Sequence, residues 1–225
     1  YDLSLCPFTQ CPSYRELDHL SFDQRIEALR SAERRARILA EKPANPRYLS
    51  ATRDFERMFE LGDPPDYEPD PATSLLSRAQ SMGCTPEALA YDLMLQSGGR
   101  ALLLVAAQDY TYGSLVPMLE MLRHQDTLLG LGDGGAHCGI VCDASYSTHM
   151  LTHWTRDRKR GDRLDLSTVI KRLSNDNAAA LALTDRGRLA PGYKADLNVI
   201  DYDRLRLHEP RIVRDMPAGG RRMLQ

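Results

Sequence analysis

The sequence lacks several features that would place it in a special class of protein. No apolar run approaches the roughly 20 residues that a membrane-spanning helix requires, and no basic and then apolar leader opens the chain. The formal net charge is only -2, with acidic and basic residues interspersed, so no overall field favours nucleic acid or an anionic membrane. Internal repeats and low-complexity tracts are missing as well. These absences indicate a globular protein with neither a nucleic-acid nor a membrane partner.

Cysteine is sparse. The 5 cysteines are odd in number and form no paired Cys-x-x-Cys module, which favours reduced thiols in a cytoplasmic protein over a disulfide framework. Of the 225 residues, 42% are hydrophobic, enough for one sizeable core and a smaller satellite domain. The chain opens on Tyr1 rather than Met and stops on Gln225 just after a Pro-Ala-Gly-Gly turn. We therefore expect that either end was cut from a longer polypeptide.

Capping residues and apolar spacing predict helices along the first half of the chain. The expected ranges are Ser21 to Lys42, Thr73 to Met82, Thr85 to Ser97 and Ser114 to His124. In the first of them, Ile26, Leu29, Ala36 and Leu39 share one face. Residues 57–61 predict a short strand, and the acidic, proline-rich residues 63–71 predict an irregular connector.

Two apolar runs flank the last of these helices and predict buried strands. They are Ala101 to Ala107 and Leu128 to Leu131. A strand, a crossover helix and a second strand within roughly 30 residues form a parallel unit, which implies an α/β fold.

Further helices are expected near Thr148 to Lys159, from Leu166 onward, and over Asn177 to Leu183. The pattern then changes. Gly187 to Asp201 combines a Pro-Gly turn with alternating residues, which predicts a β-hairpin. We place a domain boundary near Leu183 for this reason.

Asp133 is the first candidate for a working residue. It directly follows the second apolar run and stands among glycines in Gly-Leu-Gly-Asp-Gly-Gly-Ala-His. Parallel α/β folds keep their chemistry at the carboxyl ends of strands, and glycines let the backbone approach a ligand closely. A carboxylate there can bind a metal or accept a proton from a hydrolytic water. The alternative, an Asp that makes a turn with its own backbone, is common in Asp-Gly pairs and stays open.

Other polar residues near Asp133 allow more than one interpretation. His137 could bind a substrate carboxylate, ligate a metal or pack in the loop. Cys138 and Cys142, followed by Asp143, resemble a metal cluster only superficially, because their spacing is not that of a known zinc module.

His149 and His153 lie at i and i+4 on one predicted helix face, which is the geometry of a metal clamp. A zinc protease needs Glu at the position of Met150, so histidines packed in a core or interface beside Trp154 are the favoured interpretation. A basic cluster follows near the helix C-terminus, where cations complement the helix dipole, although one arginine could reach an anionic substrate. The cluster consists of Arg156, Arg158, Lys159, Arg160 and Arg163.

Four stretches resemble the C-terminal part of the amidohydrolase superfamily, most closely its D-aminoacylase branch, the N-acyl-D-amino-acid deacylases. They are Leu129 to His137, Trp154 to Arg158, Asp185 to Asp201 and Asp215 to Arg222. The third is the most specific, because it is similar to the Gly-x-x-Ala-Asp-Leu signature at which such chains leave the barrel for a small β domain. The resemblance is clear from about Thr73 onward and thinner before Leu61.

The resemblance implies both a fold and a site. The implied fold class is α/β: the C-terminal part of a (β/α)8 metal-dependent hydrolase barrel in residues 1–183, followed by part of a small β-sandwich domain in residues 184–225. Asp133 matches the carboxylate that ends the eighth barrel strand, ligates metal and moves the proton between the hydrolytic water and the leaving amine. Gly134, Gly135 and His137 would line the substrate pocket.

The chain departs from the family pattern in its metal ligands. Family members bring a His-x-His pair from the first strand, a bridging ligand from the middle of the barrel, and histidines from the fifth and sixth strands. Only His19 and His124 precede Asp133 here, and one carboxylate cannot hold a zinc ion that takes four ligands. We therefore expect one or two zinc ions whose other ligands lie outside this chain, in the remaining N-terminal segment of the same enzyme.

The expected activity is hydrolysis of the linear amide of a small-molecule N-acyl-D-amino acid. Two alternatives stay open: a noncatalytic scaffold or interaction domain of hydrolase ancestry, and a cyclic-amide hydrolase of the same superfamily. The missing ligands favour the scaffold, whereas Asp133 and the well-kept Asp185 to Asp201 motif favour a fragment of a working enzyme. A homo-oligomer is also compatible with the sequence.

Overall fold

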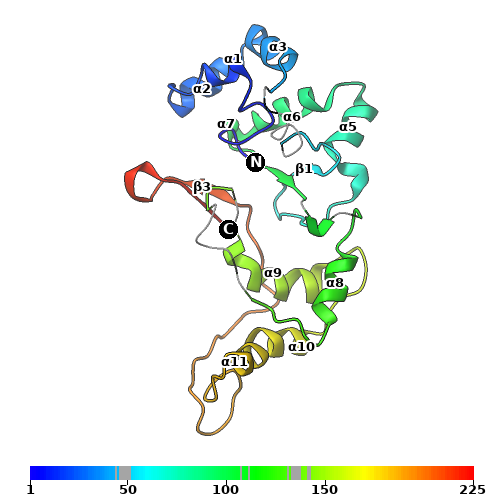
Figure 1. Cartoon of the computed structure of the whole chain (residues 1–225), viewed down its shortest axis with the longest axis vertical. Helices are drawn as coiled ribbons and strands as arrows, with labels where there is room; N and C mark the ends of the chain where they lie inside the picture. Colours follow the sequence, from blue (N-terminus) through cyan, green and yellow to red (C-terminus); the bar gives the residue numbers. More distant parts are fainter. Residues whose placement is uncertain are drawn as a thin grey trace. The chain divides into compact units, whose positions relative to one another are not determined.

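The computed structural model describes residues 1–43, 45, 52–106, 108–110, 112–130, 132, 138–140 and 143–225. These residues pack as two units, Tyr1–Gly62 with Pro69–Gly113 and Asp63–Glu68 with Ser114–Gln225, and each unit is described by itself. Helices dominate both units, and the strands are few and short (Figure 1). The predicted boundary near Leu183, with domains at 1–183 and 184–225, stays a prediction.

The first unit begins with three helices, α1 (Pro12–Arg15), α2 (Phe22–Leu29) and α3 (Ala32–Ala40). Ser21 caps α2 as predicted, and its side chain and that of Gln24 bond reciprocally to each other's backbone N–H. The single long helix expected from Ser21 is wrong, because Ser31 interrupts it and caps α3 through the backbone N–H of Arg34. The break also changes the buried face, so that Ile38 is buried in place of Ala36.

Three further helices follow, α5 (Leu75–Met82), α6 (Pro86–Met94) and α7 (Gln96–Gly99). The predicted end of the first helix and the predicted start of the second are confirmed, whereas the first begins at Leu75 rather than Thr73 and the second ends at Met94 rather than Ser97. Gly83 ends α5 in the left-handed conformation with φ 66°, where a glycine carries no steric penalty. Thr85 caps α6, and Pro86 occupies its first turn. Short 3-10 turns join other segments of the chain, at Pro71–Thr73, Gln108–Tyr110, Asp143–Ser145 and Pro217–Gly219.

A two-stranded sheet completes the first unit. Strand β1 (Met58–Glu60) pairs antiparallel with β2 (Leu103–Val105), with Phe59 opposite Leu104. Both strands were predicted, and Met58 of β1 and Leu103 of β2 belong to the same core as the buried side chains of the helices. The largest fully buried apolar side chains of this core include Phe8, Tyr14, Leu29, Ile38, Met58, Leu75, Met94 and Leu103.

The predicted parallel unit is not formed by the described residues. Helix α8 (Val116–Arg123) is present as expected, but Leu128 to Gly130 are not in a strand, and Leu131 lies outside the described part of the chain. The carbonyl of Leu129 accepts a hydrogen bond from the Asn177 side chain instead of from a neighbouring strand. Within the described residues both ladders are antiparallel and no closed barrel is present. The (β/α)8 barrel therefore stays a prediction.

The second unit contains two helices that each continue into a π turn. Helix α9 (Tyr146–Thr152) runs into the π turn His153–Asp157, and α10 (Leu166–Lys171) runs into the π turn Arg172–Asp176 and then α11 (Asn177–Ala180). The three predicted helices are thus confirmed, although the π turns were not foreseen. No helix of the described residues combines the length and the apolar character that crossing a membrane demands.

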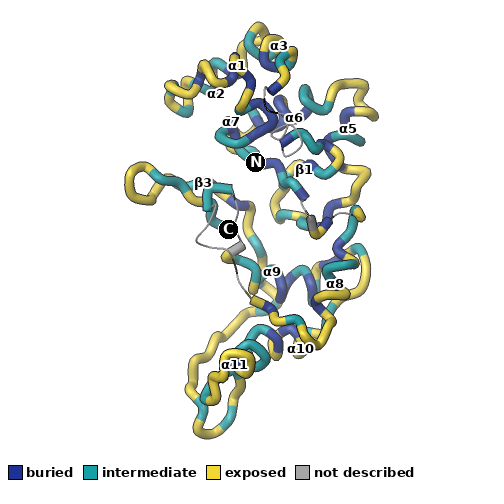
Figure 2. The backbone as a smooth tube through the Cα atoms, viewed as in Figure 1, coloured by how far each residue is buried: buried dark blue, intermediate teal, exposed yellow. Residues whose placement is uncertain are grey.

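The β-hairpin predicted over Gly187 to Asp201 is wrong. This segment is irregular and largely exposed, as the yellow tube after α11 in Figure 2 shows. Asp185 holds its first turn, because the Asp185 carbonyl and carboxylate bind the backbone N–H and the side-chain ammonium of Lys194, each at 2.8 Å. The hairpin lies farther on, between β3 (Arg211–Val213) and β4 (Arg222–Leu224). Alternation alone did not identify the strands, because pairing needs a partner whose position the local pattern does not contain.

Two methionines of the first unit test where its core lies. Met94 in α6 is 1% exposed, whereas Met82 at the end of α5 is 63% exposed. We expect Met94→Ala to lower the free energy of unfolding by about 2 to 5 kcal/mol, because it removes buried apolar atoms and leaves a cavity. The matched change Met82→Ala should cost less than about 0.5 kcal/mol. Urea denaturation measures both values, and equal losses would contradict the described core.

Candidate functional site

The residues predicted for the site, Asp133, Gly134, Gly135 and His137, all lie outside the described residues. Their assigned roles in catalysis, metal ligation and substrate binding therefore stay predictions. The structure does describe the chain on either side of them, up to Gly130, at Gly132, over residues 138–140 and from Asp143 onward.

Side chains from the π turn Arg172–Asp176 and from α11 hold the chain that leads into the motif. Asn177 Nδ2 donates to the carbonyl oxygen of Leu129 at 2.5 Å. Arg172 donates to the carbonyl of Leu122 and, at 2.5 Å, to the carbonyl of His124. These two carbonyls belong to the end of α8, where a helix leaves acceptors without internal partners. The stretch from the end of α8 to Leu129 is thus bonded to one neighbouring element.

The chain that follows the motif is held by the C-terminal hairpin. The backbone N–H of Met223 in β4 donates to the carbonyl of Cys138 at 2.6 Å, and the Cys138 thiol lies 3.6 Å from the carbonyl oxygen of Arg221. Cys142, the other member of the thiol pair considered above, lies outside the described residues. A thiolate metal site at this pair remains without support.

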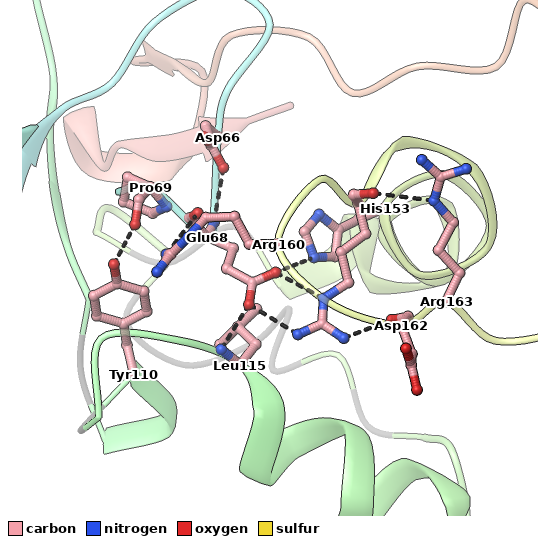
Figure 3. Close-up of polar contacts among 10 residues, drawn as sticks. Asp66, Glu68, Pro69, Tyr110, Leu115, His153, Arg160, Asp162 and Arg163 are labelled. Carbon is pink, nitrogen blue, oxygen red and sulfur yellow. Dashed lines mark hydrogen bonds and ion pairs between the residues drawn. The ribbon is translucent and has the colours of Figure 1, made fainter. Parts of the chain in front are cut away.

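The most buried charges of the second unit form an ion pair that the sequence did not reveal. Glu68 is 2% and Arg158 1% exposed. The guanidinium donates from Nε and Nη2 to the two carboxylate oxygens at 2.8 and 2.9 Å, and the backbone N–H of Leu115 adds a bond of 2.8 Å. Figure 3 shows Glu68 with Leu115 and with Arg160, which donates to the backbone carbonyl of Glu68.

The electrostatics of Glu68 follow from these contacts. Burial opposes ionisation of the carboxyl, but the hydrogen bonds from Arg158 and Leu115 and the nearby positive charge outweigh it, so the pKa of Glu68 lies below its usual value. Arg158 also lies over the ring of Trp154, 4.7 Å from its centroid, and donates to the carbonyl of Asp162 at 2.6 Å. Of the predicted basic cluster, Arg158 therefore binds groups of this chain rather than a substrate anion.

His149 and His153 share one helix face, as predicted, and their rings stack with centroids 4.8 Å apart. Tyr67 and Trp154 contact the two rings edge-on. Both Nε2 atoms are buried and lack a hydrogen-bond partner in the described structure, although His153 Nε2 is 3.3 Å from Glu68 Oε2 (Figure 3). This arrangement supports the interpretation of packed histidines over that of a metal clamp.

Burial also determines the protonation of these two imidazoles. It lowers the pKa of His149 to about 3, with a further contribution from neighbouring His153. Burial likewise lowers the pKa of His153, and the carboxylate of Glu68 only partly opposes this effect. Both rings are therefore neutral at pH 7.

The described residues do not fit a zinc site. Among them, no group of three or more His, Cys, Asp or Glu side chains is placed to hold a metal ion. Glu68, the carboxylate nearest to the histidine pair, already binds Arg158 and Leu115. Zinc needs about four ligands, so these side chains cannot supply its site.

The residues that organise this unit were not identifiable from the sequence pattern. Glu68 lies in the acidic, proline-rich connector, where it looks like one more solvated charge. Its partner Arg158 is 90 residues away, and Arg172 and Asn177 reach a stretch 48 to 50 residues before them. The one available signal was the second stretch of resemblance, Trp154 to Arg158, which placed an arginine beside an aromatic residue.

Comparison with known families identifies the family to which the chain belongs. The profile of the Amidohydrolase family matches residues 6–219. This chain belongs to the amidohydrolase family. Comparison with curated proteins and with solved structures finds no match. Family membership indicates a hydrolase of amide carbon–nitrogen bonds with (β/α)8 barrel ancestry, in a family whose members are typically metal-dependent. The D-aminoacylase branch is a finer assignment than this match supports.

The buried ion pair predicts a large loss of stability when one partner is removed. Glu68→Ala leaves the charge of Arg158 buried and unpaired, so we expect the free energy of unfolding to fall by about 3 to 5 kcal/mol. The control is Asp162→Ala, which removes an exposed carboxylate 3.2 Å from Arg123 and should cost about 1 kcal/mol or less. Chemical denaturation at pH 7 compares the two. A loss for Glu68→Ala no larger than for Asp162→Ala would show that the pair is unimportant.

The lowered pKa of His149 predicts a pH dependence of stability. Between its unfolded pKa of 6.5 and its folded pKa of about 3, the unfolded chain binds a proton that the folded chain does not. The free energy of unfolding therefore falls as the pH drops, by about 1.4 kcal/mol per unit.

His149→Phe keeps an aromatic ring at this position and removes the titration. We expect its loss of stability between pH 7.5 and 5.0 to be about 2 kcal/mol smaller than that of the unmodified protein. The control His208→Phe changes an exposed histidine and should keep the original pH dependence. Urea denaturation at the two pH values measures the loss of stability of each protein. Equal losses in all three proteins would rule out a buried neutral His149.

Proposed function

We propose that this chain is part of a metal-dependent amidohydrolase that removes the acyl group from N-acyl-D-amino acids. The observation that carries the proposal is the match to the amidohydrolase family over residues 6–219, which includes the glycine-bounded carboxylate Asp133. The Asp185 to Asp201 motif and its likeness to the D-aminoacylase branch support the choice of a linear amide. A cyclic amide is the alternative substrate within the same family.

Asp133 is the general base of the proposed reaction. It accepts a proton from the hydrolytic water as the water oxygen attacks the amide carbonyl carbon, and it returns that proton to the nitrogen when the carbon–nitrogen bond breaks. Gly134 and Gly135 line the substrate pocket, because a backbone without side chains permits close approach. His137 binds the carboxylate of the substrate.

Zinc, in one or two ions, is the proposed cofactor. Bound zinc makes a hydrolytic nucleophile available at neutral pH and polarises a carbonyl group. Asp133 is the ligand proposed from this chain, and the others come from the N-terminal segment of the same enzyme.

Substituting Asp133 tests the proposal in the chain combined with its N-terminal segment. Asp133→Asn keeps the shape of the side chain but removes the base, so kcat for an N-acetyl-D-amino acid should fall about 10²- to 10⁴-fold. Asp126→Asn, an exposed aspartate a few residues earlier, is the matched control and should leave kcat unchanged. Hydrolysis is followed by release of the free amine, together with the zinc content of each protein.

Three results would contradict the proposal in different ways. Hydrolysis of the L-enantiomer or of a cyclic amide in preference to the D-substrate would change the substrate class. Full activity of Asp133→Asn would remove Asp133 from the mechanism. Neither zinc nor hydrolysis in the combined protein would favour the noncatalytic scaffold.

A further inference from the structure

The π turn Arg172–Asp176 lies between α10 and α11, and it changes which side chains face the same way. Arg172 and Asn177 are five positions apart. In a regular α-helix with 3.6 residues per turn, such side chains point about 140° apart. A π turn is closed by bonds from residue i to i+5, so residues with this spacing come onto one face.

Both side chains bond the same stretch of the chain. Arg172 donates to the carbonyls of Leu122 and His124, and Asn177 donates to the carbonyl of Leu129. Arg172, Leu122 and Leu129 are all buried. Side chains at both ends of the π turn therefore donate hydrogen bonds to the chain that leaves α8.

A glycine from the motif that carries the family resemblance packs directly against this π turn. A Cβ atom on Gly187 would lie 3.0 Å from the carbonyl oxygen of Ser174 and 2.7 Å from Cβ of Ala178, and Gly187 has φ +89°. No other residue fits this position without displacing the turn. Lys171, the last residue of α10, also bonds the carboxylate of Asp176 at the end of the turn, at 2.6 Å. Contacts with Gly187 and Lys171 therefore stabilise the π turn.

We propose that Asn177 is a positioning residue for Asp133, and that the π turn orients the Asn177 side chain toward the carbonyl of Leu129. This inference rests on the proposed function of Asp133. Leu129 lies four residues before Asp133 in the sequence, so a bond to its carbonyl fixes the chain as it enters the catalytic motif. Met223 holds the other end through the carbonyl of Cys138. Catalysis depends on placement, and a shift of about 1 Å caused by a distant change costs about 100-fold in rate.

The experiment compares Asn177→Asp with Asn198→Asp in the chain combined with its N-terminal segment. Both changes add the same charge, but only the first removes a donor to the chain before the motif, because Asn198 is exposed and lies outside the π turn. We expect kcat of Asn177→Asp to fall about 10- to 100-fold, with KM changed less than about threefold. Asn198→Asp should keep both constants.

Two further measurements separate positioning from general stability. Hydrogen exchange should accelerate in a peptide covering residues 125–132 of Asn177→Asp but not in a peptide covering α2. Gly187→Ala, which displaces the π turn without changing the side chain of residue 177, should reproduce the loss of kcat. If Gly187→Ala does not fold, the comparison of Asn177→Asp with Asn198→Asp still decides.

Some outcomes would overturn the inference. One is an Asn177→Asp protein with lower thermal stability but undiminished kcat in its folded fraction, since that is a purely structural role. Another is unchanged exchange in residues 125–132, which would show that Asn177 does not hold this stretch. If the unmodified protein hydrolyses no N-acyl-D-amino acid, the proposed function fails and the catalytic role of Asn177 falls with it. The exchange measurement then still decides whether Asn177 anchors the chain.

Discussion

The ion pair between Glu68 and Arg158 is the interaction on which the second unit depends. It joins three segments that are far apart in the sequence: the acidic connector, the start of α8 and the turn after α9. Removing two charges from water is costly, and their attraction compensates only when the remaining hydrogen-bonding groups are also satisfied. Here the backbone of Leu115 and the carbonyl of Asp162 complete the set. The pair therefore specifies one arrangement of these segments rather than merely adding stability.

The imidazoles beside this pair show how one charged contact shapes its surroundings. Arg158 already neutralises Glu68, so His153 needs no charge of its own although it lies 3.3 Å from the carboxylate. Both His149 and His153 can then stay neutral and pack as aromatic rings between Tyr67 and Trp154. A spacing that is compatible with metal binding serves packing instead, because the nearest carboxylate is committed elsewhere.

The match to the family includes the glycine-rich motif, and the structure describes the chain before and after that motif. The match to the amidohydrolase family covers nearly the whole chain, whereas the residues predicted for chemistry lie outside the described part. What the structure contributes is the support on both sides: Asn177 and Arg172 before the motif and the β3–β4 hairpin after it. Such support is what a site needs in order to hold a carboxylate in a reactive position.

The sequence by itself determined the features that depend on neighbours within a turn or two. Ser21, Thr85, Pro86 and Gly83 set the ends of their helices, because a cap bonds groups two or three residues away. Only the tertiary structure decided the partner of Glu68, the strand that pairs with β2 and the face that Asn177 presents. Each of these depends on residues about 45 to 90 positions apart, and local periodicity carries no information about such contacts. The failed hairpin at Gly187 to Asp201 has the same cause, since alternation describes a strand only where another strand lies beside it.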